Sequence, residues 1–240
     1  MLSEQDAYQN DGRLESGWSV ISEKIAAQCA AAFGIPAEAR KVAADALKLA
    51  PDSPGAQAEA AVAFAMAGDA AETEVLARDL ATRFPLDTQV QSLWLPAIEA
   101  QLALNRNDSA SALEKVQSAS PPLELGLVAF AANASGSCLY LTYVRGEAYL
   151  AAGQGKEAAA EFQKILDHTG IVWNCWTGAL AHVGVARANA LQAKTSQGVD
   201  ADAARVRALA AYKDFLTLWK DADPDIPILK QAKAEYAKLQ

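Results

Sequence analysis

The sequence predicts an all-α protein in which helix hairpins stack into a solenoid. Hydrophobic residues make up 52% of the 240 residues, and alanine is the commonest residue. Alanine, leucine, glutamate and lysine favour helix, and the alternating apolar pattern of strands is nearly absent. Gly34 and Gly68 are 34 residues apart, as are Pro51 and Pro85, which indicates a repeated helix-hairpin unit. We therefore expect a single repeat domain over residues 1–240.

The N-terminal third contains an irregular start followed by aligned units. Residues 1–33 are this irregular start. Between Leu14 and Phe33 only Gly17 could interrupt a helix, so one long helix and two shorter ones both remain open. The segments "AAAFGIPAEARKVAADALKLAP" and "AVAFAMAGDAAETEVLARDLATRFP" then align over their glycines and prolines. A third unit runs from Leu93 to Pro121, with "RNDSASALEKV" across its turn.

The middle of the chain, residues 123–137, is expected to be a connection outside the repeat pattern. It overlaps the uncharged stretch Leu125 to Val144, which is about as long as a membrane span. Polar residues at its centre, such as Asn133 and Ser135, would lie unpaired in hydrocarbon. We therefore expect helix, turn and helix there, and no membrane insertion.

The clearest unit runs from Tyr143 to Leu166. Gly146-x2-Tyr149 is followed by Ala158-x3-Phe162, with "AAGQGKEA" between them. These are the spacings of a tetratricopeptide repeat, a helix-turn-helix unit of about 34 residues. The family signature thus predicts two packed helices joined by a tight turn.

The Gly-Lys pair in that turn could also suggest a phosphate-binding loop. Such a loop needs glycine five residues before the Gly-Lys pair and Ser or Thr after it. Leu150 and Glu157 occupy those two positions. The segment is therefore predicted to be a turn, without nucleotide binding.

The C-terminal region is predicted to hold a fifth helix pair and a capping helix. Ala179–Gln192 pairs with Ala203–Trp219, and the long turn over residues 193–203 is expected to be mobile. Apolar residues at helical spacing over residues 225–239 predict a final helix, which Asp223 could cap. A capping helix protects the apolar end of a solenoid from solvent.

Whole phrases of the chain resemble the C-terminal tetratricopeptide region of bacterial serine/threonine protein kinases. The phrases are "RFPLDTQVQSLWLPAIEAQLAL", "YVRGEAYLAAGQGKEAAAEFQKILDHTGI", "GALAHVGVARANAL" and "AAYKDFLTLWKDADPDIPILKQAKAEYAKL". The resemblance covers most of the chain and implies a sensory or docking role. No H-R-D, D-F-G or V-A-I-K phrase is present, so it implies no catalysis. The chain departs from these relatives at "VWNCWTG" and at the turn after Gln192.

Residue types that carry catalysis or bind metals do not form a recognisable pattern. His168, Cys175 and His182 lack the paired spacing of a zinc site, and Cys175 has no orienting acid for nucleophilic catalysis. Asp221 and its alternating neighbours fit a helix cap better than a calcium loop. We therefore expect no metal, no cofactor and no enzymatic activity.

Cysteine usage and charge limit the compartment and the partners. Cys29, Cys138 and Cys175 are odd in number and far apart, so buried reduced thiols are expected. The net charge is −8 without a basic cluster, which argues against nucleic acid and anionic membranes as partners. The start "MLSEQDAYQNDG" is not a signal peptide, which favours the cytoplasm. Derivation from a membrane kinase would instead place the chain outside the cytoplasm.

A partner groove is the main functional candidate. Tyr140, Tyr143 and Glu147 share the helix face opposite Gly146 and Tyr149, and Trp94 and Gln101 occupy the equivalent face of the preceding unit. In a repeat solenoid that face lines the concave surface, where a peptide could bind. The alternative is that the segment Leu123–Asn133 covers the two tyrosines.

Two further residues, Trp173 and Trp176, flank a connection between helices. They could form a contact loop, or they could close the gap between successive helix pairs. The sequence thus favours a protein- or peptide-binding module. A sensory region detached from a kinase and a self-association scaffold that uses the two tryptophans are the alternatives.

Overall fold

All regular structure in the described part of the chain is helical. The computed structural model describes residues 23–117, 138–172 and 174–240, and these contain no strand. Residues 23–32 form the first described helix, which we call the 23–32 helix. The others are α2 (Pro36–Leu49), α3 (Pro54–Met66), α4 (Ala70–Arg83), the π-helical η1 (Val90–Trp94), α5 (Leu95–Asn105), α6 (Ser109–Gln117), α8 (Tyr140–Ala151), α9 (Gly155–Asp167), α10 (Thr169–Val172), α11 (Trp176–Thr195), α12 (Gly198–Leu218) and α13 (Pro227–Leu239). The prediction of an all-α protein is confirmed.

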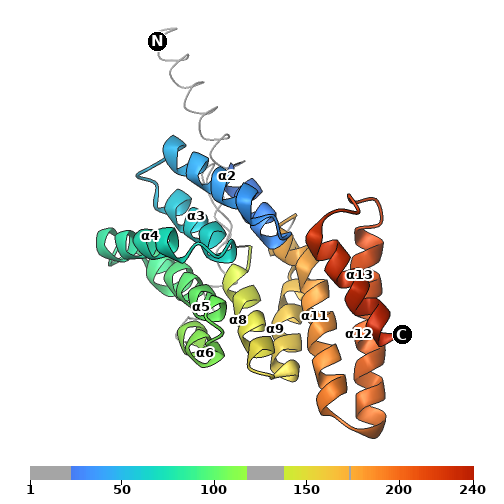
Figure 1. Ribbon diagram of the computed structural model, residues 1–240. Coiled ribbons are helices and arrows are strands. Elements are labelled where there is room, and N and C mark those ends of the chain that lie inside the picture. Colours follow the sequence, from blue (N-terminus) through green and yellow to red (C-terminus); the bar gives the residue numbers. More distant parts are fainter. Residues whose placement is uncertain (1–22, 118–137, 173) are drawn as a thin grey trace.

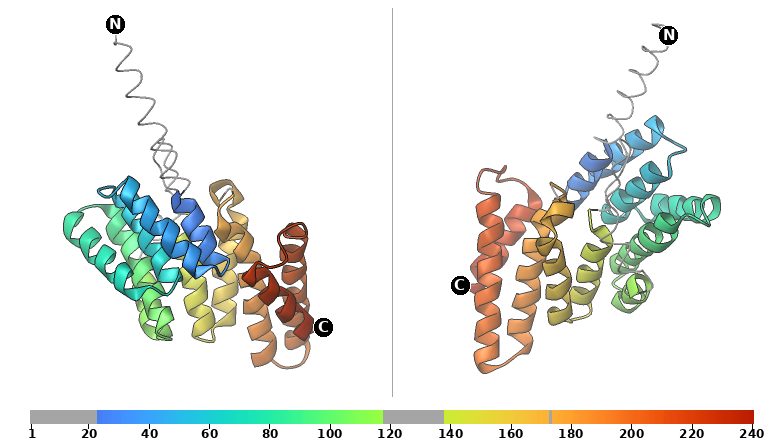
Figure 2. Two further views of the ribbon diagram at one scale, coloured as in Figure 1. Left: turned by 45° about the horizontal axis from the view of Figure 1, so that its top comes forward. Right: turned by 180° about the vertical axis from the view of Figure 1, so that it is seen from behind.

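The long helices pack as a row of pairs (Figure 1). Helices α3 and α4, α5 and α6, α8 and α9, and α11 and α12 each pack together, and the second helix of one pair packs on the first helix of the next. The first helices, α3, α5, α8 and α11, also contact one another in that order. In the two views of Figure 2, α8 and α9 lie between the α5–α6 pair and the α11–α12 pair.

Four hairpin turns close in the same way. Gly34, Gly68, Asn107 and Gly153 all have a positive φ, between 58° and 89°, which glycine and asparagine adopt most readily. The residue after each donates its N–H to a carbonyl five positions earlier, as Gln154 does to Tyr149 at 2.8 Å. The same capping bonds thus end the first helix of four pairs.

Proline and polar caps explain where several helices begin. Pro36, Pro54 and Pro227 each occupy the start of a helix, where their missing N–H has no partner to lose. Ser53 caps α3 and Asp69 caps α4, each with a side-chain oxygen that accepts a hydrogen bond from a backbone N–H group.

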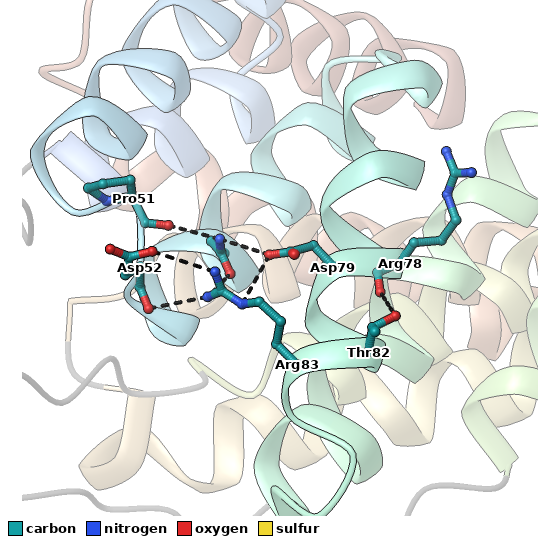
Figure 3. Close-up of polar contacts among 7 residues, drawn as sticks. Pro51, Asp52, Arg78, Asp79, Thr82 and Arg83 are labelled. Carbon is teal, nitrogen blue, oxygen red and sulfur yellow. Dashed lines mark hydrogen bonds and ion pairs between the residues drawn. The ribbon is translucent and has the colours of Figure 1, made fainter.

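Polar side chains fix the connection between α2 and α3 onto α4 (Figure 3). Arg83 donates to the Asp52 carbonyl at 3.3 Å, and its Nε lies 3.4 Å from Asp79 Oδ2. Gln57 donates to the Pro51 carbonyl at 2.8 Å and to Asp79 at 3.1 Å. The proline that marks the repeat spacing therefore sits in a hydrogen-bonded connection.

The core of the C-terminal half is built around Phe162 of α9. Its side chain is fully buried and lies against Gly146 of α8 and Gly184 of α11. A Cβ added at Gly146 would lie 2.7 Å from Phe162 Cζ, and one added at Gly184 would lie 2.5 Å from Phe162 Cγ or Cδ1. The phenylalanine ring thus requires glycine on both neighbouring helices.

The predicted long mobile turn over residues 193–203 is wrong. Helix α11 continues to Thr195 and α12 begins at Gly198, so only Ser196 and Gln197 lie between them. Alanine and lysine after Gln192 propagate the first helix. Asp200 in the first turn of α12 interacts favourably with the positive end of the helix dipole.

The expectation that all three cysteines are reduced is also wrong. Cys138 and Cys175 form a disulfide with a Cα–Cα distance of 5.7 Å, and Cys29 is free. Cys138 lies just before α8 and Cys175 just before α11. Helices α8 and α11 are the first helices of successive pairs, and they contact each other. The disulfide therefore joins the N-terminal ends of these two helices, although the cysteines are 37 residues apart in sequence.

The final helix, predicted over residues 225–239, begins at Pro227 and packs on α12. It also reaches the beginning of the described chain, because Ile228 donates its N–H to the Phe33 carbonyl at 3.2 Å. The rings of Phe33 and Trp219 lie 4.9 Å apart, edge to face. The two ends of the helix row therefore touch.

Two remaining expectations concern other segments. Residues 1–22 and 123–137, which hold most of the irregular start and the whole predicted non-repeat connection, lie outside the described residues. Among the helices that are described, none has the length and apolar character needed to cross a membrane.

The contact of Phe162 with two glycines gives a stability prediction. Gly146→Leu and Gly184→Ala should each lower the free energy of unfolding by about 1–3 kcal/mol, because the added atoms collide with the buried ring. Urea unfolding monitored by circular dichroism measures this. Gly170→Ala is the control, since a Cβ there would meet nothing within 4 Å. Equal stability of all three variants would contradict the proposed packing.

The disulfide gives a second prediction, which thiol titration checks. The unfolded protein without reductant should show one reactive thiol, that of Cys29, and all three thiols should react after reduction. Reduction should lower the free energy of unfolding by roughly 2–4 kcal/mol, because the unfolded chain gains conformational entropy when the bond no longer restrains it. Three reactive thiols before reduction would rule the bond out.

Candidate functional site

A cleft of about 520 Å³ opens between the 23–32 helix and the first helices of the four following pairs. Its walls come from α3, α5, α8 and α11, with the end of the 23–32 helix on the other side. The lining residues are Ala31, Ala32, Met66, Gln101, Leu104, Asn105, Tyr143, Glu147, Leu150, Ala151 and Leu180. Seven of the eleven lining residues are Ala, Leu or Met, and the other four bring polar groups to the cleft.

The 23–32 helix is held across this face by contacts to both ends of the row of first helices. Lys24 pairs with Glu59 of α3 at 3.3 Å, and both side chains are buried. Trp176 of α11 donates its indole N–H to Gln28 at 3.2 Å. Helices α3 and α11 are the outer members of the row of first helices, so the 23–32 helix extends across the whole row. The open space that remains beside it is the cleft.

Polar groups on one wall of the cleft bond to one another. The Tyr140 hydroxyl donates to Gln101 Oε1 at 3.2 Å, and Gln101 Nε2 donates to Asn105 Oδ1 at 3.2 Å. Asn105 Nδ2 donates to the Ala65 carbonyl at 2.7 Å. These hydrogen bonds connect α8, α5 and α3. The side-chain oxygen and nitrogen atoms of both Gln101 and Asn105 take part in them.

Tyr143 is the aromatic residue of the cleft lining, and other aromatic rings pack against it. The Tyr143 ring lies edge to face with Trp176 at 4.9 Å and with Phe162 at 5.4 Å. The Tyr140 ring lies 5.9 Å from Trp176. These contacts fix the orientation of Tyr143, whose side chain lines the cleft.

Glu147 is the carboxylate in the cleft lining, and its Oε1 atom has no hydrogen-bond partner within the described part of the chain. Burial raises the pKa of this carboxyl above its ordinary value of 4.5. The charge of Arg187 and the Tyr143 hydroxyl act in the opposite direction without cancelling the effect of burial. An unpaired buried acceptor of this kind costs stability unless something binds it.

Arg187, the cation that acts on Glu147, is itself bound elsewhere. Its Nε and Nη2 atoms donate to both Glu235 oxygens, at 2.9 and 3.0 Å. Glu235 also accepts the Tyr212 hydroxyl at 2.7 Å, which joins α11 and α12 to α13. Arg187 thus forms a bidentate pair with Glu235, and its charge also acts on Glu147, where it favours the ionised carboxylate.

The predicted groove residues separate into two groups. Gln101 of α5 and Tyr143 and Glu147 of α8 line the cleft together. The sequence predicts that the equivalent faces of these two helices form one surface. Trp94 and Tyr140 are only 7% and 2% exposed, so their rings belong to the core. The covering element that the structure describes is the 23–32 helix, and the segment Leu123–Asn133 lies outside the described residues.

The predicted contact loop also divides. Trp176 is 4% exposed and packs on the two tyrosines, which fits the alternative in which it closes a gap between helices. Trp173 lies outside the described residues. Met66, Asn105 and Leu180 also line the cleft and were not predicted. Like the predicted residues, they belong to first helices, in which Met66 and Asn105 are the last residues of α3 and α5.

Within the described ranges no three His, Cys, Asp or Glu side chains come close enough to hold a metal ion. The titratable residues of the cleft lining are Tyr143 and Glu147.

Comparison with known proteins gives no assignment. No protein family model matches the chain, and no curated protein matches it significantly.

The raised pKa of Glu147 makes stability depend on pH. The native state binds the proton more tightly than the unfolded state, so stability present below pH 4.5 is lost as the pH rises through the raised value. The side chain that Glu147→Gln introduces cannot ionise. The melting temperature of this variant should therefore rise relative to that of the wild type as the pH increases from 4 to 8. Glu157→Gln, at an exposed position of α9, is the control. Parallel pH profiles for the wild type and Glu147→Gln would contradict the burial of this charge.

Proposed function

We propose that the chain is a tetratricopeptide-like repeat solenoid that binds a protein or peptide partner through the cleft. The order of packing supports this reading, because each first helix contacts its own partner helix and, from α5 on, both helices of the preceding pair. The equivalent turns at Gly34, Gly68, Asn107 and Gly153 support it further. The resemblance to the repeat region of bacterial kinases belongs to the same proposal.

The observation that carries the binding role is the cleft itself. It is formed by the first helices, which line the concave surface in solenoids of this kind. The 23–32 helix already lies across that face, so a partner cannot extend along all of it. We infer that one projecting side chain or chain end of the partner enters the cleft while the rest contacts its rim.

A small-molecule receptor is the second candidate. The volume of about 520 Å³ lies within the range of small-molecule sites, and it would suit the sensory role of a kinase region. Self-association through the tryptophans receives less support, because Trp176 is used inside the fold.

The disulfide bears on the compartment. Bonds of this kind persist in oxidising environments and are rare in the cytosol. The Cys138–Cys175 bond therefore favours an extracytoplasmic location.

Selection of peptides from a random display library tests the proposal. Peptides selected on the wild-type protein should bind Ala151→Phe at least about tenfold more weakly, because the ring fills the cleft from a tolerant, exposed position. Ala81→Phe, at an exposed position of α4 outside the cleft, should bind them unchanged. Fluorescence anisotropy measures the affinities, and thermal melting checks that both variants fold.

Equal binding to both variants would place the partner site away from the cleft. Failure to select any peptide, together with binding of small molecules that Ala151→Phe abolishes, would favour the small-molecule receptor instead.

A further inference from the structure

We propose that the cleft is a receptor site for a positively charged group, an alkylammonium or guanidinium head, whose counter-charge is Glu147. This inference deepens the proposed function, on which it rests, by giving the chemical class of the bound group. It depends on which groups of the cleft are already satisfied and which are not.

The amides of the cleft do not call for a ligand. Gln101 and Asn105 bond to each other, to Tyr140 and to the Ala65 carbonyl. A polar ligand would have to break these bonds before making its own, with little net gain. The amides therefore position the wall and leave Glu147 as the polar group of the lining with an unused acceptor.

Charge balance distinguishes Glu147, which is partly buried, from three other acids that are buried or partly buried. Glu59 pairs with Lys24 at 3.3 Å, Glu161 pairs with Arg145 at 3.1 Å, and Glu235 takes both contacts from Arg187. Glu147 Oε1 has no such contact, and burial raises the pKa of this carboxyl. A bound cation would supply the contact that Glu147 Oε1 lacks, whereas an anion would be repelled.

The rest of the cleft suits the body of such a ligand. Tyr143 sits beside Glu147 with its ring held by Trp176 and Phe162, and an aromatic ring also attracts a cation. Around them lie apolar side chains able to contact a hydrocarbon stem, namely Met66, Leu104, Leu150 and Leu180. A lysine side chain of a partner and a free alkylamine share this combination of apolar stem and charged head.

The test uses two probe pairs on the full chain at constant ionic strength. Nα-acetyl-lysine N-methylamide is compared with its neutral norleucine analogue, and n-butylammonium chloride with 1-butanol. Ligand-detected NMR titration gives the affinities. Each cation should bind at least about tenfold more tightly than its neutral analogue, because only the cation pairs with the buried carboxylate.

Glu147→Gln should remove that preference while keeping the shape of the cleft, and Glu157→Gln should retain it at an exposed position of equal charge change. A preference for the lysine derivative over n-butylammonium would point to a peptide side chain as the source, and the reverse to a small amine. Equal binding of charged and neutral probes, or a preference that survives Glu147→Gln, would overturn the inference.

The proposed function can fail separately from this inference. If displayed peptides bind in a manner that Ala151→Phe abolishes while neither cation is preferred, the cleft is a partner site but not a cation site. If the cations are preferred and no peptide depends on the cleft, the charge inference holds and the peptide function fails.

Discussion

The packing of Phe162 between two glycines sets the distance between three helices. A side chain at Gly146 or Gly184 would push α8 or α11 away from α9. Close approach here places α8 beside α11, so that their beginnings meet at Cys138 and Cys175 and their inner faces meet at Tyr143 and Trp176. The disulfide, the aromatic rings packed against Tyr143 and the position of Glu147 all depend on this packing of one ring.

Local signals in the sequence predicted much of the helix arrangement. Gly34, Gly68 and Gly153 end helices because only a residue that tolerates a positive φ closes this type of turn. Asn107 occupies the same position, but without glycine it gives a weaker signal. The turn after Gln192 was misjudged because its polar residues resemble a loop, although they suit the end of one helix and the start of another.

The candidate site was only partly predictable, for reasons of distance along the chain. Helical spacing placed Tyr143 and Glu147 on one face, and that face does line the cleft. The spacing could not show that Gln28 meets Trp176, since these residues are 148 positions apart. The unpaired state of Glu147 Oε1 depends on side chains from several helices, which no local pattern describes. The disulfide was missed for the same reason.

The contact between the two ends of the described helix row changes how the array should respond to stress. Linear repeat arrays can fray from either end, because a terminal unit has one neighbour and its loss leaves the others intact. Here Phe33 lies against Trp219 and bonds to Ile228, so the outermost units support each other. Losing either end would expose apolar surface on the other. Such a closed arrangement couples distant repeats and favours cooperative unfolding over progressive unravelling.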